Sequence, residues 1–543
     1  MLTPPPSQPV SSPGPAASLP AATPSDRPPE VALQYVEPMP KPRQRHSRPA
    51  PRFLTDHTQQ LDPFLGCPEE IVPKDHPARK VQRWVAALDT RELEKGYSSL
   101  GRRGFHPANL LAVWIYAGLT GLHYATEVTR ALRTDAAFRL LSGGYVIKET
   151  TLRTFRREHG DFFAHALQQT IQMAQEAGLI DPDALAVDSM RLRADAAMAS
   201  IRTQKRSRTR LTELEKVDPE TLDEEAQTRH AEKVAKHEAA VKRCEEEGCT
   251  SFSATTPSAA LMKFPSGATL PGHRITATAC CSDLRLVVSL LVDASPNDYG
   301  LLGPAVSQAR TNLVKAGLPE SCALEVAADA GYDSKEDLAF GDAQADWLRL
   351  FVALREKEGA TKSKTFSPDA FEIHDDGSAT CPAGRAMAGP TRMKDGRHQW
   401  RGVDCGTCPL KPSCTRTSRR TLTRDVEGVR LRQSMHARLR TPAGKARYLQ
   451  RMATVEPVFS ILEDVMGYRR ASSRLTDTVQ AEILLKVLTY NLTRLEKAGA
   501  VVPVCVSFAA TPRGFRLLAI WLPPGAIEIF PGSPDTALLL YPF

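Results

Sequence analysis

The sequence lacks the features that would direct the chain into or across a membrane. Its first ten residues, MLTPPPSQPV, contain neither a basic segment nor an apolar core, so we expect no secretory signal. The longest apolar run, at 108–125, is interrupted by Asn109 and His123 and favours a buried helix over a membrane span. We therefore expect a cytoplasmic protein without a membrane partner.

The sequence also lacks a disulfide pattern and any extreme of composition. Its 11 cysteines are odd in number and scattered, which indicates reduced thiols. Hydrophobic residues make up 42% and charged residues 24%, as in ordinary globular proteins. A chain of 543 residues can hold two or more domains. The net charge of +8 fits a polyanionic partner and equally fits a basic solvated surface.

Proline is concentrated at the start of the chain. Residues 1–52 hold 15 of the 42 prolines and end in several arginines. Such a segment cannot bury enough apolar surface to order itself, so we expect a disordered, mildly basic tail.

From about residue 75 to 181 the pattern is helical, which predicts an all-helical domain. Arg153, Arg156 and Arg157 cluster near the start of one of its expected helices. Two interpretations stay open here. The arginines belong either to a helix-turn-helix-like element that faces phosphate or to the exposed surface of a helical bundle.

The middle of the chain alternates between strands and helices, which predicts an α/β sheet. A short apolar strand is expected to end at Asp188, followed by an inserted helical hairpin in the charged segment 203–247. The basic run at 202–210 fits a solvated face as well as a phosphate contact. Further strands are expected at 274–281, 284–295, 322–332 and 347–354, with helices at 297–318 and 334–341.

Three acids are the candidate catalytic residues. Asp188 and Asp329 each follow an apolar strand, and open α/β sheets place their sites at the carboxyl ends of strands. Glu456 lies on an expected helix, beside Pro457, which either starts a new helical stretch or kinks the helix. Carboxylate oxygens suit Mg²⁺ or Mn²⁺, and phosphodiester cleavage by two such ions needs several acids. Each acid alone would also fit an ordinary surface or capping position.

A cysteine-rich insertion is expected between the last strand and the helix of Glu456. Residues 360–440 contain Cys381, Cys405, Cys408 and Cys414, whose spacing suits a structural tetrahedral Zn²⁺; the alternative is four free thiols. An arginine track that includes Arg432 and Arg440 follows, and arginine favours phosphate contacts.

The ordered set of these segments resembles bacterial insertion-sequence transposases with a ribonuclease H-like DDE domain, over residues 58–497. The segment ALAVDSMRLRADAA resembles the family's first-aspartate strand, with Arg191 and Arg193 as the basic residues that follow it. VAADAGYDSKEDL resembles the second-aspartate strand and turn, and RYLQRMATVEPVFSIL resembles the glutamate helix, with Tyr448 and Arg451 in matching positions.

The resemblance implies a fold, a reaction and partners. It implies a ribonuclease H-like mixed sheet at 182–497, a helical DNA-binding domain at 58–181, and a segment at 498–543 of unknown role. The implied reaction is metal-dependent cleavage at transposon ends and strand transfer into target DNA, with Asp188, Asp329 and Glu456 as metal ligands. The implied partners are double-stranded DNA, with nucleoid association when bound, and further copies of the chain.

Two departures from the family pattern leave other functions open. The family often has glycine after its first aspartate, where this chain has Ser189, and lysine two turns after its glutamate, where this chain has Glu463. The alternatives are a metal-dependent nuclease without strand transfer and a DNA-binding protein whose catalysis has decayed.

Overall fold

A computed structural model describes residues 51–520, except for residues 64, 257, 281–283, 356–364, 367, 375, 395, 502–505 and 512–513. The predicted tail therefore lies outside the described residues, apart from its last two positions, and so do residues 282 and 283 between two of the expected strands. Within the described part of the chain, no helix has both the length and the apolar character needed to cross a bilayer.

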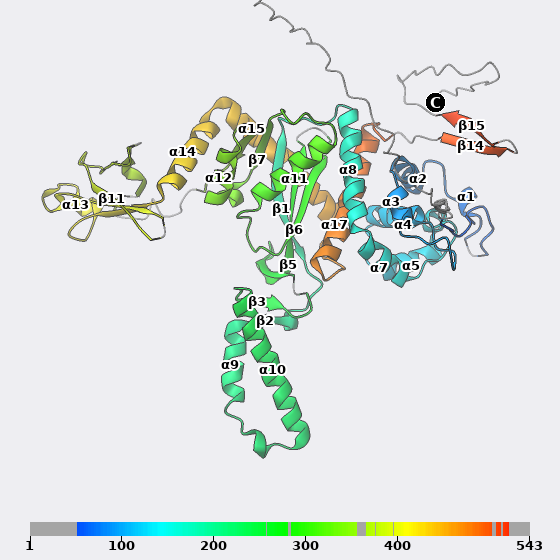
Figure 1. Ribbon diagram of the computed structural model, residues 1–543, viewed down its shortest axis with the longest axis horizontal. Helices are drawn as coiled ribbons and strands as arrows, with labels where there is room; N and C mark the ends of the chain where they lie inside the picture. Colours follow the sequence, from blue (N-terminus) through cyan, green and yellow to red (C-terminus); the bar gives the residue numbers. More distant parts are fainter. Residues whose placement is uncertain are drawn as a thin grey trace, which may run out of the picture. The chain divides into compact units, whose positions relative to one another are not determined.

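The expected helical segment folds as a series of eight helices, drawn in blue to cyan in Figure 1. Only His159 separates α7 from α8. The eight helices are α1 Pro68–Ile71, α2 Pro77–Ala87, α3 Arg91–Glu94, α4 Pro107–Leu119, α5 Ala125–Thr134, α6 Ala136–Leu141, α7 Glu149–Glu158 and α8 Gly160–Glu176.

A mixed six-stranded sheet forms the centre of the α/β region. The strand order is β4-β5-β1-β7-β8, and β6 also pairs with β5. β4 pairs with Thr269 to Gly272 of β5, and β6 pairs with Arg274 to Ala279. β1 runs antiparallel to β5 and parallel to β7, and β7 runs parallel to β8. The strands are β1 Leu185–Arg193, β4 Ala260–Lys263, β5 Thr269–Cys280, β6 Val287–Asp293, β7 Leu324–Ala328 and β8 Leu348–Val352.

The first strand corrects one prediction from the sequence. β1 does not end at Asp188 but continues to Arg193, because β5 pairs with it along its whole length. Its pairing with β7, in contrast, covers only Leu185 to Val187. Asp188 therefore lies at the position where β1 loses one neighbour and keeps the other.

Helices cover both faces of the sheet. Helix α11 (Leu302–Lys315) packs on β5 and β6, whereas α15 (Pro442–Thr454) packs on β1, β7 and β8. α12 (Lys335–Ala343) lies between β7 and β8 in the chain, and α14 (Val426–Arg440) packs on α12, α15 and β8. The long helix α17 (Thr476–Lys497) packs on α4, α7, α8 and β6, so the helical region and the sheet share one continuous apolar core.

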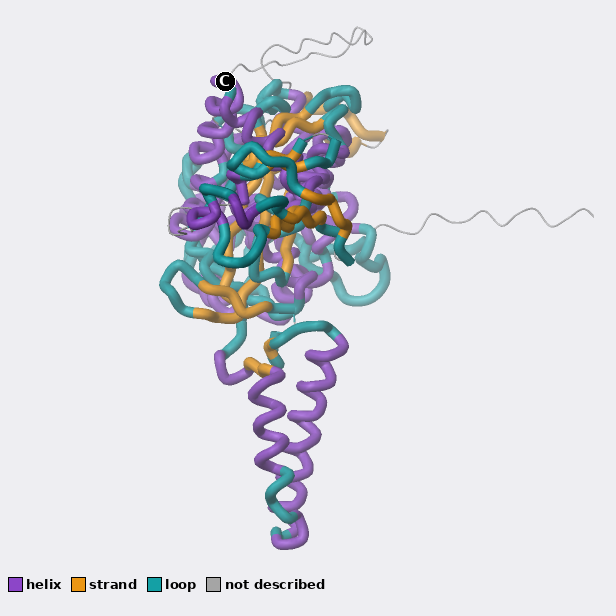
Figure 2. The backbone as a smooth tube through the Cα atoms, turned by 90° about the vertical axis from the view of Figure 1, so that its left-hand side faces the viewer, coloured by secondary structure: helices purple, strands orange, loops and turns teal. Residues whose placement is uncertain are grey.

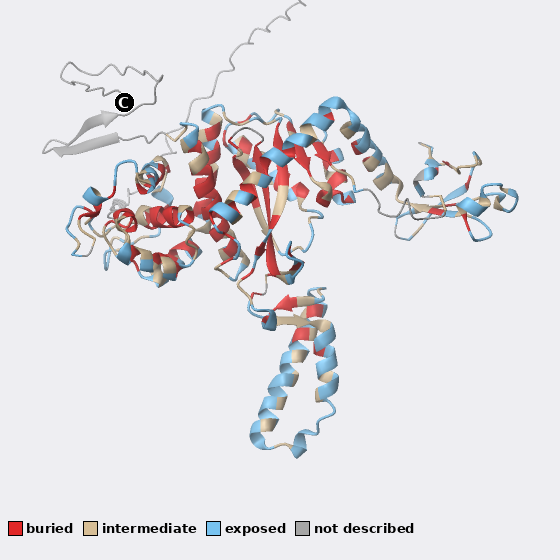
Figure 3. Cartoon of the chain, turned by 180° about the vertical axis from the view of Figure 1, so that it is seen from behind, coloured by how far each residue is buried: buried red, intermediate tan, exposed pale blue. Residues whose placement is uncertain are grey.

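Two insertions interrupt the sheet region. The expected hairpin is formed by α9 (Gln204–Leu214) and α10 (Glu224–Glu246), which lie side by side (Figure 2). A short pair of strands, β2 (Ile201–Thr203) and β3 (Ser251–Ser253), joins the ends of this hairpin and was not predicted. Figure 3 shows the hairpin helices largely exposed and the central strands buried, as the charged composition of the hairpin requires.

The cysteine-rich segment has its own small core around Trp400 and Leu422. Its sheet consists of β11 Ala388–Arg392, β12 His398–Arg401 and β13 Thr421–Arg424, with β9 Glu372–Ile373 and β10 Ala379–Thr380 as a second pair. The helix α13 spans Lys411–Cys414. Near the end of the chain, β14 (Val506–Thr511) and β15 (Gly514–Ile520) pair antiparallel.

Candidate active site

The two candidate aspartates stand in register on neighbouring strands. The last parallel pair between β1 and β7 is Val187 opposite Ala328; Asp188 is the next residue of β1, and Asp329 is the first residue after β7. The Asp188 carboxylate accepts a hydrogen bond from the backbone N–H of Ser189 (2.8 Å), and the Asp329 carboxylate accepts one from Gly331 (2.7 Å). Both acids therefore leave the sheet at one edge.

Arg451 joins the third acid to the first. Its Nη1 lies 3.1 Å from Asp188 Oδ2, and its Nη2 lies 3.4 Å from Glu456 Oε1. Arg451 is 8% exposed, whereas the Glu456 side chain is about half exposed. Asp188 of β1 and Glu456, which follows α15, thus both contact the buried guanidinium of Arg451.

The electrostatics of the site reflect this grouping. Burial, together with the charge of Asp329, raises the pKa of Asp188 to about 6, although the Ser189 hydrogen bond and the charge of Arg451 lower it. Burial lowers the pKa of Arg451, but the negative groups around it, including all three candidate acids, outweigh burial and raise that pKa. Repulsion among the acids is relieved by this one cation.

Pro457 starts a new helical segment rather than kinking a continuous one. α15 ends at Thr454, and α16 (Glu456–Ser460) begins with Glu456 and Pro457 in its first turn. It passes directly into a π-helical turn, η6 (Ile461–Val465). A π-helical turn holds more residues than an α-helical one, so Glu463 is rotated from the position that a continuous α-helix would give it. Arg469, which follows closely, forms its ion pair with Asp464 (2.6 Å) and not with Glu463.

A fourth acid, Asp298, also lies at this edge and was missed in the sequence. Its carboxylate pairs with Arg274 and accepts a hydrogen bond from the Ser189 hydroxyl. The signal was present: Asp298 follows β6 by five residues, and Arg274 is the one Lys, Arg, Asp or Glu residue of its strand, where a buried cation requires an acid partner.

The arginines predicted to contact DNA in the helical region differ in exposure. Arg153 and Arg157 are exposed, each with an acidic neighbour on its own helix. Arg156 is a correction, because it is 6% exposed and its guanidinium is held inside the fold. It donates to the carbonyl of His123 (3.1 Å) and to the hydroxyl of Ser472 (2.7 Å), and it faces Glu482.

The remaining predicted DNA contacts fall into two groups. Arg191, Arg193 and Arg440 are exposed, although Arg191 also donates to the carbonyl of Lys263. Arg432 is half-buried and pairs with Asp333 (2.6 Å), and Tyr448 is half-buried below the Arg451 guanidinium. Arg451 itself is engaged by the acids, as described above.

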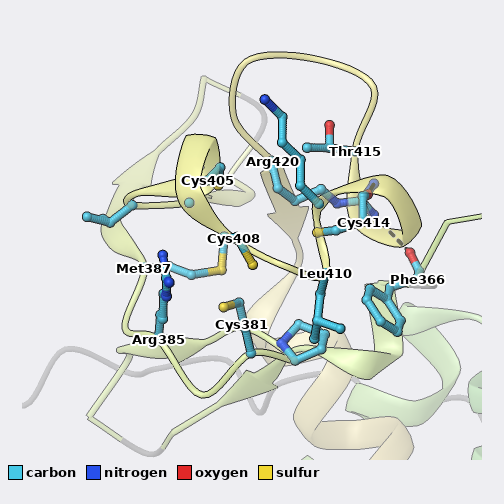
Figure 4. Close-up of a pocket in the computed structure, with 15 residues that line it drawn as sticks. Phe366, Cys381, Arg385, Met387, Cys405, Cys408, Leu410, Cys414, Thr415 and Arg420 are labelled. Carbon is cyan, nitrogen blue, oxygen red and sulfur yellow. Dashed lines mark hydrogen bonds between the residues drawn. The ribbon is translucent and has the colours of Figure 1, made fainter.

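The four predicted zinc ligands line one small pocket (Figure 4). Cys381 follows β10, Cys405 begins a short 3₁₀ turn that Cys408 follows, and Cys414 ends α13. Burial raises the pKa of Cys414, and the charges of the other three cysteines, when ionised, raise that pKa further. All four are free thiols and none is fully buried.

No three His, Cys, Asp or Glu side chains among the described residues are grouped closely enough, in these conformations, to hold a metal ion. At the carboxylate site the reason is visible, because the Arg451 guanidinium lies between Asp188 and Glu456. Metal binding by either set would require side chains to move.

Comparison with known families is consistent with this geometry. Residues 380–496 match the family model described as Transposase DDE domain, a segment that includes Glu456 but neither aspartate. Residues 67–158 match the family model described as Transposase domain (DUF772), which covers most of the helical region. A search of curated proteins found no match. The two family matches, over separate parts of the chain, support an insertion-sequence transposase with a DDE domain.

Proposed function

We propose that this transposase cleaves DNA at the ends of its element and transfers those ends into target DNA. The observation that carries the proposal is the meeting of Asp188, Asp329 and Glu456 around Arg451. Two acids come from adjacent strands and the third from a helical segment packed after α15. This arrangement supports a ribonuclease H-like organisation of the sheet.

The donor set suits Mg²⁺ or Mn²⁺, since all the candidate ligand atoms are carboxylate oxygens. The acids already stabilise one positive charge here, that of Arg451, which supports the binding of a cation at this position. Bound metal would stabilise charge on the attacking and leaving oxygens. In cleavage, water attacks the phosphorus and a 3′ oxygen leaves as a hydroxyl. In strand transfer, that 3′-hydroxyl attacks a target phosphodiester, and the target's own 3′ oxygen leaves.

The proposed DNA surface uses the exposed arginines of both regions, which are Arg153, Arg157, Arg191, Arg193 and Arg440. Phosphate contacts of this kind position a duplex without reading its sequence. Because two element ends must be handled together, we also propose that the active form contains at least two copies of the chain, associated with the nucleoid through DNA.

For the cysteine pocket we propose one structural Zn²⁺ held by Cys381, Cys405, Cys408 and Cys414. The support is that Cys381, which is distant in sequence, lines one pocket with the neighbouring Cys405, Cys408 and Cys414, beside a very small apolar core. Small domains with so little core commonly need a metal for stability.

The experiment that tests the function uses labelled DNA from either end of the element and a supercoiled target plasmid, with Mg²⁺. A transposase gives both cut ends and joined target products. A nuclease gives cut ends only, and a decayed DNA-binding protein gives a shifted complex with neither product. Absence of joined products in Mg²⁺ and in Mn²⁺ would overturn the proposal.

A further inference from the structure

Arg274 is an almost completely buried cation at the edge of the candidate site. It is 1% exposed, lies on β5 and is directly opposite Arg191 of β1. Its Nε donates to the carbonyl of Ser295 (3.1 Å) and its Nη2 to that of Pro296 (2.6 Å). Arg274 therefore fixes the loop between β6 and α11 against the sheet.

The remaining nitrogen of Arg274 connects this loop to the first aspartate strand. Nη1 donates to the Ser189 hydroxyl (2.7 Å) and pairs with Oδ1 of Asp298. The Ser189 hydroxyl donates to the same Oδ1. Ser189 is the residue next to Asp188, so the side chain that departs from the family's usual glycine has a specific contact here.

The two oxygens of Asp298 are used differently. Oδ1 receives both hydrogen bonds described above, whereas no hydrogen bond from the described residues reaches Oδ2. A Cβ atom placed on Gly331 would lie 2.8 Å from Asp298 Oδ2 and 2.7 Å from Asp329 Oδ1. The free oxygen of Asp298 and the carboxylate of Asp329 thus border the same small space, which is open only because residue 331 is glycine.

A second polar group faces this region. The Tyr332 hydroxyl is fully buried and makes no hydrogen bond of ordinary geometry among the described residues, although the Ser189 and Thr276 side chains lie beside it. The charges of Asp298 and Asp188 act on it. A buried hydroxyl without a partner usually marks a place where a ligand or water completes the contacts. It lies beside the acids and belongs to the turn that carries Gly331.

We propose that Asp298 is a fourth carboxylate of the divalent-cation site, oriented by Arg274 and Ser189. One oxygen is anchored by two donors, which leaves the other to face Asp329. A carboxylate fixed in this way loses little freedom on binding a cation, so it favours binding more than a mobile surface acid would. The inference rests on the proposed metal site at Asp188 and Asp329.

The test measures Mn²⁺ binding to the full-length protein, without DNA, from the electron paramagnetic resonance signal of free Mn²⁺. Asp298→Asn keeps the size of the side chain and removes its charge. The matched control is Asp62→Asn, because Asp62 is also 17% exposed and also pairs with an arginine, Arg139, within the helical region. Asp188→Asn reports on the proposed site itself.

Asp298→Asn is expected to weaken Mn²⁺ binding by about tenfold or more, and Asp62→Asn to leave it unchanged. Unchanged binding in Asp298→Asn, with weakened binding in Asp188→Asn, would overturn the inference and leave the proposed site intact. No Mn²⁺ binding by the wild type, or no effect of Asp188→Asn, would overturn the proposed site as well.

A second variant covers the case in which Asp298→Asn does not fold. Ser189→Ala removes one donor to Asp298 Oδ1 and keeps every charge. We expect it to weaken Mn²⁺ binding by a few-fold, roughly the effect of losing one hydrogen bond. Wild-type affinity in a folded Ser189→Ala protein would overturn the orienting role of this network.

Discussion

Asp188 and Asp329 are neighbours across two parallel strands, one position beyond the last pair of Val187 and Ala328. Adjacent strands are about 4.8 Å apart, so the two side chains leave the sheet at the same edge. β1 continues along β5 to Arg193, while β7 ends and turns through Gly331. The acids therefore lie where the pairing between β1 and β7 ends.

Gly331→Ala is expected to damage the site without disturbing the fold elsewhere. Its backbone conformation suits any residue, but the new methyl group would collide with the carboxylates of Asp329 and Asp298. We expect weaker Mn²⁺ binding and slower DNA cleavage. Gly96→Ala is the control, because nothing lies within 4 Å of a Cβ at Gly96. Wild-type activity in Gly331→Ala would mean that the two carboxylates do not need this space.

Arg451→Gln is expected to make stability depend on metal. Without metal, loss of the guanidinium leaves Asp188 without its cation, at a cost of about 2–3 kcal/mol. Added Mg²⁺ supplies a replacement charge, so it should raise the melting temperature of the variant more than that of the wild type.

The control for Arg451 lies four residues earlier on the same helix. Arg447 pairs with Glu325 at 2.8 Å, away from the three candidate acids. Arg447→Gln is expected to lose stability without gaining a larger response to Mg²⁺. Equal responses to Mg²⁺ in Arg451→Gln and wild type would show that Arg451 does not occupy a cation position.

Protein purified without chelator is expected to contain one Zn²⁺ per chain, measured by mass spectrometry of the metal. Cys408→Ser should lose that zinc, because it removes one of the four thiols that line the pocket. Cys322→Ser should keep it, since Cys322 lies outside the pocket. Zinc-free wild-type protein, or full zinc content in Cys408→Ser, would reject the structural metal.

A buried lysine makes stability depend on pH. Lys486 is 3% exposed in the core shared by α17 and the N-terminal helices, and its ammonium group donates to the carbonyl of Leu122 (3.1 Å). Burial lowers the pKa of Lys486 to about 7, against the raising effect of Glu482. The unfolded chain, with its ordinary pKa of 10.5, therefore binds more protons than the folded chain between these two values.

Stability should accordingly rise as the pH increases above 7. Through the titration of Lys486, the free energy of unfolding is expected to increase by roughly 1 kcal/mol per pH unit between pH 7 and 9. Urea unfolding over this range should show a shallower rise in Lys486→Met than in wild type. The exposed Lys497, at the end of the same helix, provides the control variant Lys497→Met. Parallel profiles for wild type and Lys486→Met would reject this assignment.

The sequence predicted the order of the elements well, because apolar periodicity and local charge determine where strands and helices form. The strands around Val326 and Leu350 and the charged hairpin illustrate this. The predicted end of β1 was wrong, because the length of this strand depends on its pairing with β5, which is distant in sequence. The π-helical turn after Phe459 likewise has no local signal that periodicity could reveal.

The candidate site was predicted in part for the same reason. An acid after a run of apolar residues is a local pattern, and it is the basis on which Asp188 and Asp329 are predicted as site residues. Arg153 and Arg156 lie on the same helix, yet Arg156 is buried because Glu482 and Ser472 approach it from more than 300 residues away. The pairing of Arg274 with Asp298 is likewise visible only once β5 and the loop after β6 are brought together.

Cleavage of DNA that carries the terminal sequence of the element is the most direct measurement of the proposed activity. Wild-type protein and Asp329→Asn are compared in Mg²⁺, with end binding measured in parallel by gel shift. We expect the wild type to cut at the end, and Asp329→Asn to bind with similar affinity and to produce no cut strand. Cutting by Asp329→Asn at the wild-type rate would contradict the assignment of this carboxylate to the active site.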